Sequence, residues 1–304
     1  MTDRVGAGRY APSPTGELHL GNLRTAVLAW LFARSTGRAF LLRIEDLDTS
    51  RVRPGLAEQQ LLDLTALGLD FDGVPVVQSQ RAAAYAAALT RIADRTYECF
   101  CTRREIAEAA SAPHGLPGRY PGTCRDLSPA ERAERGRSRT PALRLRAEGA
   151  WQTVDDLLHG AVTGPVDDFV VRRNDGVAAY NLAVVVDDAE SGVDQVVRGD
   201  DLLSSAVNQA YLAELLGHPA PSYAHVPLAV NAQGRRLAKR DGAVTLSDLA
   251  AEGVSPIEVL GLIATSLGWP APSRLADLLP RFDPSRLPRH PWVVHPASAL
   301  ESMK

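Results

Sequence analysis

The apolar and polar positions first follow a regular pattern near the N-terminus. Residues 22–37 have apolar side chains at positions 23, 27, 30 and 31 and end in a glycine, which predicts an amphipathic helix with a glycine C-cap. Residues 9–12 are a short strand candidate interrupted by a proline, and residues 40–44 are a compact apolar run typical of a buried strand. Strand, helix and strand in this order predict a parallel βαβ unit and an α/β fold.

The pattern becomes irregular between residues 99 and 165. Cysteines, prolines and an arginine-rich stretch over 132–146 interrupt any regular period there. The α/β pattern returns in the apolar runs 169–173 and 183–188, and a helix is predicted over 202–216, where a glycine follows. The irregular segment therefore looks like an insertion into an α/β domain.

These changes along the chain predict its domain organisation. We expect a Rossmann-like core domain split into residues 1–98 and 166–240, an insertion over 99–165 and a C-terminal helical region over 241–304. In the last region, Ser255 and Glu258 form a capping box with Pro256 at the first helical position, so a helix should run from there toward Gly268.

Composition narrows the class of protein. With 304 residues, 45% of them hydrophobic, the chain can bury a full α/β core. The N-terminus does not resemble a signal peptide, and no stretch reaches the roughly 18 uncharged apolar residues that a membrane span needs. We therefore expect a soluble, cytoplasmic monomer without membrane contact. The formal net charge of -3 gives no overall attraction to nucleic acid, although a local basic patch could still bind it.

Two residue types are distributed unevenly. The chain has 31 arginines but only two lysines, Lys239 and Lys304, so the internal lysine stands out. The three cysteines, Cys99, Cys101 and Cys124, all lie in the irregular segment. Cysteines clustered in this way indicate a metal site more than a disulfide framework.

The segment 11–22, APSPTGELHLGN, carries the densest chemical signal. Its turn is followed by His19 and Gly21 immediately before the predicted helix. A helix N-terminus with flexible glycines and an imidazole is a natural site for a phosphate group. Taken alone, the same residues could be only a turn and a helix cap with an incidental histidine.

A second segment, NAQGRRLAKRDGA, is polar, contains glycines and predicts a mobile loop around Lys239. A compact ammonium group can follow negative charge as it moves onto phosphoryl oxygens, where a planar guanidinium would fit less well. The alternative is a lysine on a solvated surface.

Together the two segments resemble the HIGH and KMSKS signatures of class I aminoacyl-tRNA synthetases. The order of RYAPSPTGELHLGNLRTA, LLRIEDLDTSR, VVDDAESGVDQVVRGDDLLSS and RLAKRDGA is similar to that of the glutamyl branch, over roughly residues 4 to 268. The chain departs from the signatures at three positions, where it has Asn22, Arg236 and Ala238. These departures leave His19, Gly21 and Lys239 in place.

The resemblance implies a class I synthetase fold and ATP-dependent activation of L-glutamate. It implies catalytic roles for His19, Gly21 and Lys239, and an ATP site formed by His19, Gly21, Asn22, Arg236 and Lys239. Mg²⁺ would accompany ATP, as the chemistry of the phosphates requires.

Glutamate has two carboxylates and one ammonium group, so its pocket calls for two cations and one anion. Arg9, Arg198 and Glu45 supply that set. By resemblance the glutamate site also includes Tyr10, Ala11, Pro12, Ser13 and Tyr180. Each of these residues, taken singly, could be an ordinary surface or core residue.

The pattern C-x-C followed by Y-x-x-x-C resembles the zinc site of the glutamyl-queuosine tRNA(Asp) synthetases, a truncated family related to glutamyl-tRNA synthetase. It implies one structural Zn²⁺ bound by Cys99, Cys101, Tyr120 and Cys124. His114 is an alternative fourth ligand, and three reduced thiols without a metal are the simpler alternative.

The resemblance also implies the acceptor. The chain ends soon after the KMSKS-like loop, so we expect no anticodon-binding domain. The truncated family transfers glutamate to the queuosine base at the wobble position of tRNA-Asp. Two alternatives stay open, namely a short glutamyl-tRNA synthetase that charges a tRNA 3′ end and a non-catalytic, zinc-stabilised RNA-binding protein.

Overall fold

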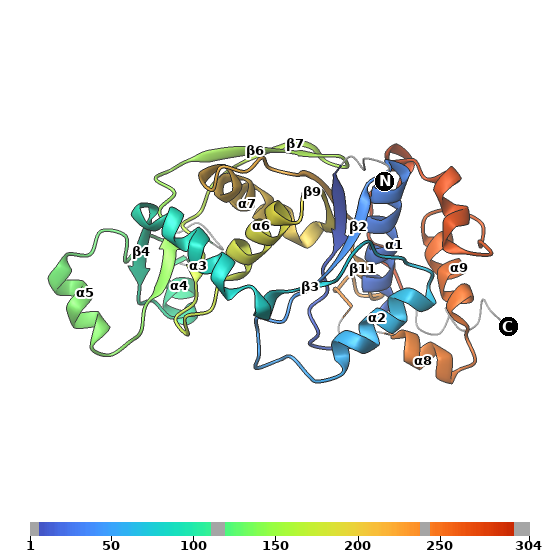
Figure 1. Ribbon diagram of the computed structural model, residues 1–304, viewed down its shortest axis with the longest axis horizontal. Coiled ribbons are helices and arrows are strands. Elements are labelled where there is room, and N and C mark those ends of the chain that lie inside the picture. The colour runs from blue at the N-terminus through green and yellow to red at the C-terminus, as the bar shows by residue number, and fades with distance from the viewer. Residues whose placement is uncertain (1–5, 111–118, 238–243, 295–304) are drawn as a thin grey trace.

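The structure is a computed structural model that describes residues 6–110, 119–237 and 244–294. Within these ranges the molecule is elongated and is built on one large sheet (Figure 1). The strands follow one another across this sheet in the order β3 (Val76–Val77), β2 (Ala39–Ile44), β1 (Ala7–Tyr10), β9 (Val193–Gly199), β10 (Ser222–Val226), β6 (Trp151–Asp156) and β7 (Gly160–Pro165). Neighbouring strands are parallel except β6 and β7, which form an antiparallel hairpin.

The predicted βαβ unit is confirmed. Strand β1, helix α1 (Leu20–Ser35) and strand β2 follow one another, and β1 and β2 pair in parallel from Ala7 with Ala39 onward. Helix α1 approaches β1 closely, because a Cβ atom on Gly8 would lie 2.9 Å from the Cβ of Ala33. The helix is buried on nearly every side, so it lacks the broad polar face of the predicted amphipathic helix.

Helices cover both faces of the sheet. Helix α1 lies on one face, and helices α6 (Tyr180–Glu190) and α7 (Leu203–Leu215) lie on the other (Figure 1). The predicted helix over 202–216 is α7, whereas the apolar run 183–188 is the buried centre of α6. The remaining helices of this part are α2 (Leu56–Ala66) and α3 (Ala82–Arg91). This arrangement is the layered α/β fold expected from the sequence.

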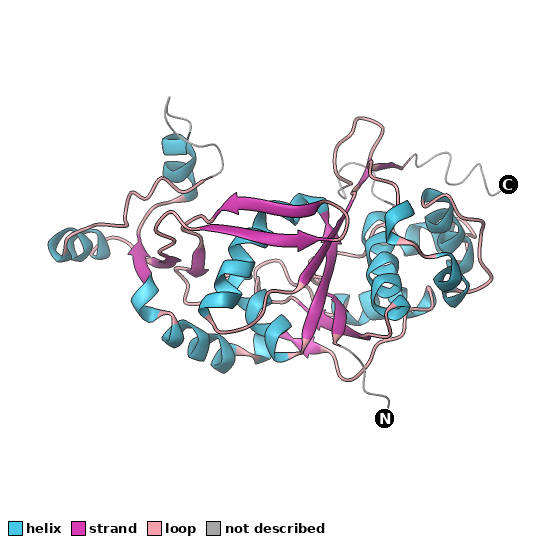
Figure 2. Cartoon of the chain, turned by 90° about the horizontal axis from the view of Figure 1, so that it is seen from above, coloured by secondary structure: helices cyan, strands magenta, loops and turns pink. Residues whose placement is uncertain are grey.

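One end of the molecule carries a smaller antiparallel sheet. It contains β4 (Thr96–Cys99), β5 (Ala142–Leu145) and β8 (Val170–Arg172), with helices α4 (Arg103–Ala110) and α5 (Pro129–Gly136) nearby (Figure 1). The segment 99–165 therefore divides between two sheets, since its last part, the β6–β7 hairpin, lies at the edge of the large sheet (Figure 2). The predicted domain boundaries stay a prediction.

The opposite end is built from the C-terminal part of the described chain. It contains helices α8 (Leu246–Ala251) and α9 (Pro256–Ser266) and a parallel pair of short strands, β11 (Ala229–Val230) and β12 (Trp292–Val293). The predicted capping box is confirmed, because the Glu258 carboxylate accepts the backbone N–H of Ser255 at 2.7 Å. Side chains of α9 complete the core around α1. Among the helices in the described ranges, none has the length and apolar character to cross a membrane.

Candidate active site and metal site

The candidate active site lies at the carboxyl ends of the central parallel strands. From β1 the chain passes through α1 to β2 on one side, while β9 pairs with the other side of β1. Open α/β sheets bind their ligands at such a switch point, outside the carboxyl ends of the strands. Arg9 lies near the end of β1, Glu45 follows β2, Arg198 lies near the end of β9 and Tyr180 begins α6. The topology thus gathers four predicted glutamate-site residues from four elements.

A buried carboxylate on α6 orients two arginines of this site. Asp188 accepts a hydrogen bond from Arg9 Nε at 3.1 Å and another from Arg43 of β2. Arg43 also donates to Glu45 Oε1 at 3.0 Å. Burial alone would raise the pKa of the Asp188 carboxyl, but the Arg43 and Arg9 guanidinium groups hold that pKa below its ordinary range. Asp188 is therefore an anion that fixes both arginine side chains.

The hydroxyl of Tyr180 is surrounded by the charged groups of the same site. Loss of solvation raises its pKa, the Glu45 carboxylate raises it further, and Arg198, Arg9 and Arg43 oppose these effects. Tyr180 is 41% exposed, so part of this residue borders solvent beside the charged groups. Arg9, Glu45, Tyr180 and Arg198 are therefore brought together as predicted from the sequence.

The loop after β1 is fixed mainly by its backbone. The Pro12 carbonyl accepts the N–H of Glu45 at 3.0 Å, and the Ser13 carbonyl accepts a hydrogen bond from the side chain of Gln60 at 3.1 Å. The Tyr10 hydroxyl donates to the Asn22 carbonyl at 3.2 Å, which joins the end of β1 to the start of α1. Ala11 is half-buried and Ser13 is exposed, so this loop forms an open wall beside Glu45.

His19 is the N-cap of α1. Its Nδ1 accepts the backbone N–H groups of Gly21 at 3.1 Å and Asn22 at 3.3 Å, while Asn22 Oδ1 accepts the N–H of His19. Burial first, and then the positive charge of Arg236, lowers the pKa of His19 to about 4. The ring is therefore neutral at pH 7, and its proton is on Nε2, since Nδ1 acts as an acceptor. His19 presents one N–H donor at the positive end of the helix.

Residues on both sides of 238–243 lie against the start of α1. Leu20 N–H donates to the Val244 carbonyl at 3.0 Å, and Arg236 forms an ion pair with Asp201. A Cβ atom on Gly21 would lie 2.9 Å from the Cβ of Ala229, so glycine permits this close approach. The described residues on either side of 238–243 therefore lie beside the first signature segment. Lys239 lies outside the described residues.

The sequence patterns did not identify several polar residues that build this site. Arg43 and Asp188 form its buried ionic network, and Asp156 and His225 form a buried pair beside Arg198. A signal was present for the first two, because an arginine inside the run 40–44 and acids inside the run 183–188 need buried partners. Asp156 and His225 do not interrupt an apolar run in this way, so no such signal was present for them.

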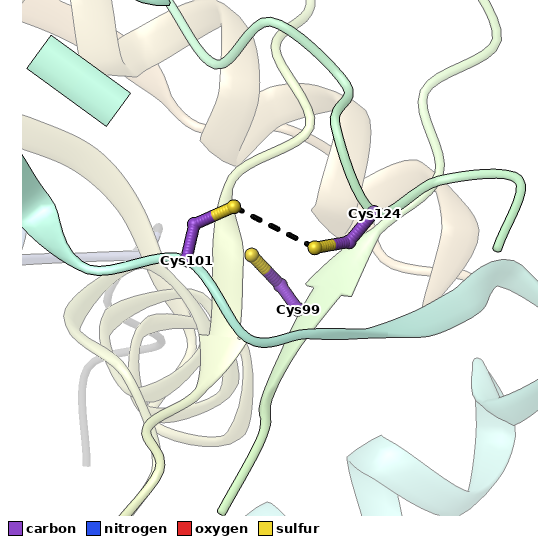
Figure 3. A group of neighbouring side chains, drawn as sticks. All are labelled: Cys99, Cys101 and Cys124. Atoms are coloured by element: carbon purple, nitrogen blue, oxygen red, sulfur yellow. Dashed lines mark hydrogen bonds between the residues drawn. The ribbon is translucent and has the colours of Figure 1, made fainter. Parts of the chain in front are cut away.

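The three cysteines form a compact cluster at the end of β4 (Figure 3). Their sulfur atoms all lie within 4.8 Å of one another, and Cys101 and Cys124 are 3.5 Å apart. A disulfide bond would need a separation of about 2.05 Å, whereas ligands at about 2.3 Å from a tetrahedral zinc ion lie roughly 3.8 Å apart. A cavity of about 440 Å³, lined partly by Cys101, lies beside the cluster. The cluster could hold a metal ion.

Tyr120 reaches the same cluster. Its hydroxyl oxygen lies 3.3 Å from Cys99 Sγ and 3.7 Å from Cys101 Sγ, and it accepts the backbone N–H of Cys124 at 2.9 Å. Burial raises the pKa of Cys101 to about 12, and burial followed by Cys99 and Cys124 raises that of Tyr120. His114, the alternative fourth ligand, lies outside the described residues.

Comparison with known proteins identifies the family. The model of the catalytic domain of class I tRNA synthetases (E and Q) matches residues 7–281. The chain belongs to this family. It is 65% identical to a glutamyl-Q tRNA(Asp) synthetase of Nocardia farcinica, over 95% of this chain and 93% of the relative. It is 48% identical to a protein of the same name from Symbiobacterium thermophilum, over 97% and 98% of the two chains. Within class I, the chain therefore belongs to the glutamyl-Q tRNA(Asp) synthetase family.

Solved structures agree with the class I fold. A glutamate-tRNA synthetase from Elizabethkingia anophelis is 28% identical, with a TM-score of 0.82 over 97% of this chain and 69% of that one. A glutamate tRNA ligase from Elizabethkingia meningosepticum, solved with its amino acid, is 27% identical, with a TM-score of 0.81 over 98% and 68% of the two chains. The class I synthetase fold predicted from the sequence is therefore confirmed.

Replacement of Asp188 by asparagine tests the ionic network of this synthetase site. We expect Asp188→Asn to lower the free energy of unfolding at pH 7 by about 3–5 kcal/mol, because the buried Arg9 loses its ion-pair partner and the buried Arg43 loses one of its partners. The folded pKa of Asp188 lies below the unfolded value of about 3.9. The stabilisation is thus complete above that value and is lost as the pH falls through the folded pKa. Urea denaturation at decreasing pH measures the difference.

The matched control is Glu134→Gln, which removes an exposed ion pair with Arg137 and should leave the unfolding free energy unchanged. A difference between Asp188→Asn and the wild type that grows in acid would contradict the assignment of Asp188 as a buried anion.

Proposed function

We propose that the chain activates L-glutamate with ATP and transfers the glutamate to the queuosine base at the wobble position of tRNA-Asp. The observation that carries this proposal is the convergence of Arg9, Arg198, Glu45 and Tyr180 at the switch point of the sheet. The 65% identity to a glutamyl-Q tRNA(Asp) synthetase over nearly the whole chain supports the acceptor.

Glutamate recognition follows from the charges of the site. Its carboxylates would pair with Arg9 and Arg198, and its ammonium group with Glu45, while the Tyr180 hydroxyl would donate to a carboxylate oxygen. Tyr10, Ala11, Pro12 and Ser13 would form the wall of the pocket next to Glu45. The side chains of Arg9 and Glu45 are already held by Asp188 and Arg43, so little ordering is needed when the substrate binds.

Adenylation then requires the α-carboxylate of glutamate to attack the α-phosphorus of ATP, with pyrophosphate as the leaving group. His19 would donate from Nε2 to a phosphate oxygen, while Gly21 and Asn22 leave room at the helix N-terminus and Arg236 adds positive charge. Lys239, by its place in the signature, would stabilise the charge that develops on the leaving group. Mg²⁺ bound to ATP supplies further neutralisation of the phosphate charge. Glutamate passes from the adenylate to the acceptor with release of AMP.

The cysteine cluster would hold one structural zinc ion. Three thiolates and the Tyr120 oxygen would supply four ligands, the number that closed structural sites have. The separations between these atoms fit such a site. The high pKa of the Tyr120 hydroxyl without metal does not exclude it, since a bound dication strongly favours the deprotonated form. Zinc would tie the start of α4 to the segment before α5. The cytoplasmic location and the monomeric state stay predictions.

The first experiment separates the possible acceptors. We expect the purified chain to catalyse glutamate-dependent exchange between ATP and pyrophosphate, and to transfer labelled glutamate to tRNA-Asp that contains queuosine. The matched control is tRNA-Asp without queuosine, which should accept none. Transfer to the 3′ end of tRNA-Glu would instead identify a short glutamyl-tRNA synthetase. Exchange that is absent both with and without tRNA would indicate a non-catalytic RNA-binding protein.

Lys239 offers a test of the second signature. We expect Lys239→Ala to lower the exchange rate by about 100- to 1,000-fold, the usual effect of losing one donor to developing charge. Lys304→Ala is the control, because it removes the other lysine of the chain and should leave the rate unchanged. Normal exchange in Lys239→Ala, with normal metal content and thermal unfolding, would exclude Lys239 from the mechanism.

Cys124 offers a test of the metal site. We expect the wild type to contain one zinc ion per chain by elemental analysis, and Cys124→Ser to lose it together with thermal stability. Thr123→Ser, at the neighbouring position, is the matched control and should keep the metal. Tyr120→Phe should weaken zinc binding while His114→Ala should not. Full zinc content in Cys124→Ser would refute the proposed metal site. Loss of zinc in His114→Ala but not in Tyr120→Phe would identify His114, and not Tyr120, as the fourth ligand.

A further inference from the structure

Arg198 is held by a series of buried polar contacts that extends to β6, the strand next to the edge of the large sheet. Its Nε donates to His225 Nε2 at 3.0 Å, and His225 Nδ1 lies 2.6 Å from Asp156 Oδ2. The side chains of His225 and Asp156 are both fully buried. The three residues come from three adjacent strands, β9, β10 and β6. This series of side-chain contacts therefore crosses the sheet from strand to strand, roughly perpendicular to the strands.

The hydrogen-bond donor on Arg198 determines which ring nitrogen of His225 carries the proton. A guanidinium N–H can only donate, so His225 Nε2 must be the acceptor and cannot carry a proton. The proton of a neutral ring then lies on Nδ1 and points to the Asp156 carboxylate. An imidazolium would place an N–H against the Nε–H of Arg198, with two like charges in contact. Burial lowers the pKa of His225, in agreement with a neutral ring.

Asp156 is itself fixed on every side. Its Oδ1 accepts the backbone N–H groups of Leu158 at 2.8 Å and His159 at 2.9 Å, while its Oδ2 accepts both the backbone N–H and the ring of His225. The same cluster includes the ring of Tyr223, which stacks on His225 at 5.6 Å, and His159, whose Nε2 lies 3.0 Å from the His225 carbonyl. Asp156 thus has no freedom to turn away from the imidazole.

The remaining contacts of Arg198 leave part of the guanidinium for a ligand. NH1 donates to Gln209 Oε1 at 2.7 Å and NH2 donates to the Leu202 carbonyl at 3.2 Å. An arginine has five N–H donors, so one donor on NH1 and one on NH2 have no acceptor among the described residues and are left for a carboxylate. Arg198 can offer both at once only if the plane of its guanidinium group does not rotate. His225 helps to hold that plane through Nε, together with the contacts of NH1 and NH2.

We propose that His225, with its Nδ1 proton held by Asp156, is a positioning residue that orients Arg198 to bind one carboxylate of the amino-acid substrate. The role rests on the proposed glutamate activation. Asp156 is the last residue of β6. The β6–β7 hairpin would therefore contribute to recognition of the amino acid through His225 and Arg198, without contacting the amino acid itself.

A complementary pair of substitutions tests this role. His225→Asn places an amide near the former Nδ1, where it can still donate to Asp156 but no longer reaches Arg198. His225→Gln places an amide oxygen near the former Nε2, where it can still accept from Arg198. We expect His225→Asn to raise the KM for glutamate about 10- to 100-fold, the effect of losing one hydrogen bond to a charged group. The kcat and the KM for ATP should change by less than about threefold, because the lost contact contributes to substrate binding.

His225→Gln should recover most of the affinity for glutamate. The matched control is His290→Asn, which changes an exposed histidine outside this group of contacts and should leave the KM unchanged. A KM for glutamate that is unchanged in His225→Asn, or raised equally in both His225 variants, would refute the positioning role. Absence of glutamate-dependent exchange in the wild type, both with and without tRNA, would refute the proposed function instead.

A measurement on the wild type does not depend on activity or on the folding of a variant. Nitrogen-15 NMR of histidine-labelled protein should show one ring, identified by its loss in His225→Gln, that is neutral at pH 7 with its proton on Nδ1. A proton on Nε2, or an imidazolium at that pH, would overturn the assignment, because neither form can accept from Arg198.

Discussion

The Asp188 carboxylate, buried between Arg9 and Arg43, is the interaction around which the candidate site is arranged. It joins α6 to the ends of β1 and β2, and it fixes the two guanidinium groups before any substrate arrives. Burial of so many charges is tolerable only because each has a partner. Arg9 and Arg198 supply two cations and Glu45 supplies one anion beside them. This set is the complement of an amino acid with two carboxylates and one ammonium group.

Local patterns predicted the parts of the fold that local chemistry determines. The capping box at Ser255 and the helix over 202–216 were found because their signals lie within a few residues of each other. The spacing of apolar residues in 22–37 identified α1 but only one of its faces. Its other faces carry alanines such as Ala26 and Ala29, whose burial depends on the sheet on one side and on α9 on the other. The sequence of the helix alone does not show which elements cover those faces.

The same distinction applies to the candidate sites. Three cysteines close together in sequence predicted a cluster, and the structure brings their sulfur atoms together. The residues of the two signatures were recognised by their order, which topology then converts into proximity. Their supporting partners were missed, because Arg43 and Asp188 are 145 residues apart, and Asp156 and His225 are 69 residues apart. Which of these meet depends on the order of strands in the sheet, and the sequence does not display that order.

The position of β6 makes the segment 99–165 more than a separate attachment. β6 pairs with β10 at a single position, Tyr223 with Asp156, and Asp156 is the residue that also holds His225. The backbone pairing and the side-chain contact therefore meet at one residue, so a shift of the hairpin would disturb both together. The segment that begins at the cysteine cluster therefore also supplies Asp156, which holds the partner of Arg198 on the central strand β9. For this reason the supporting residues of the candidate site come from so large a part of the structure.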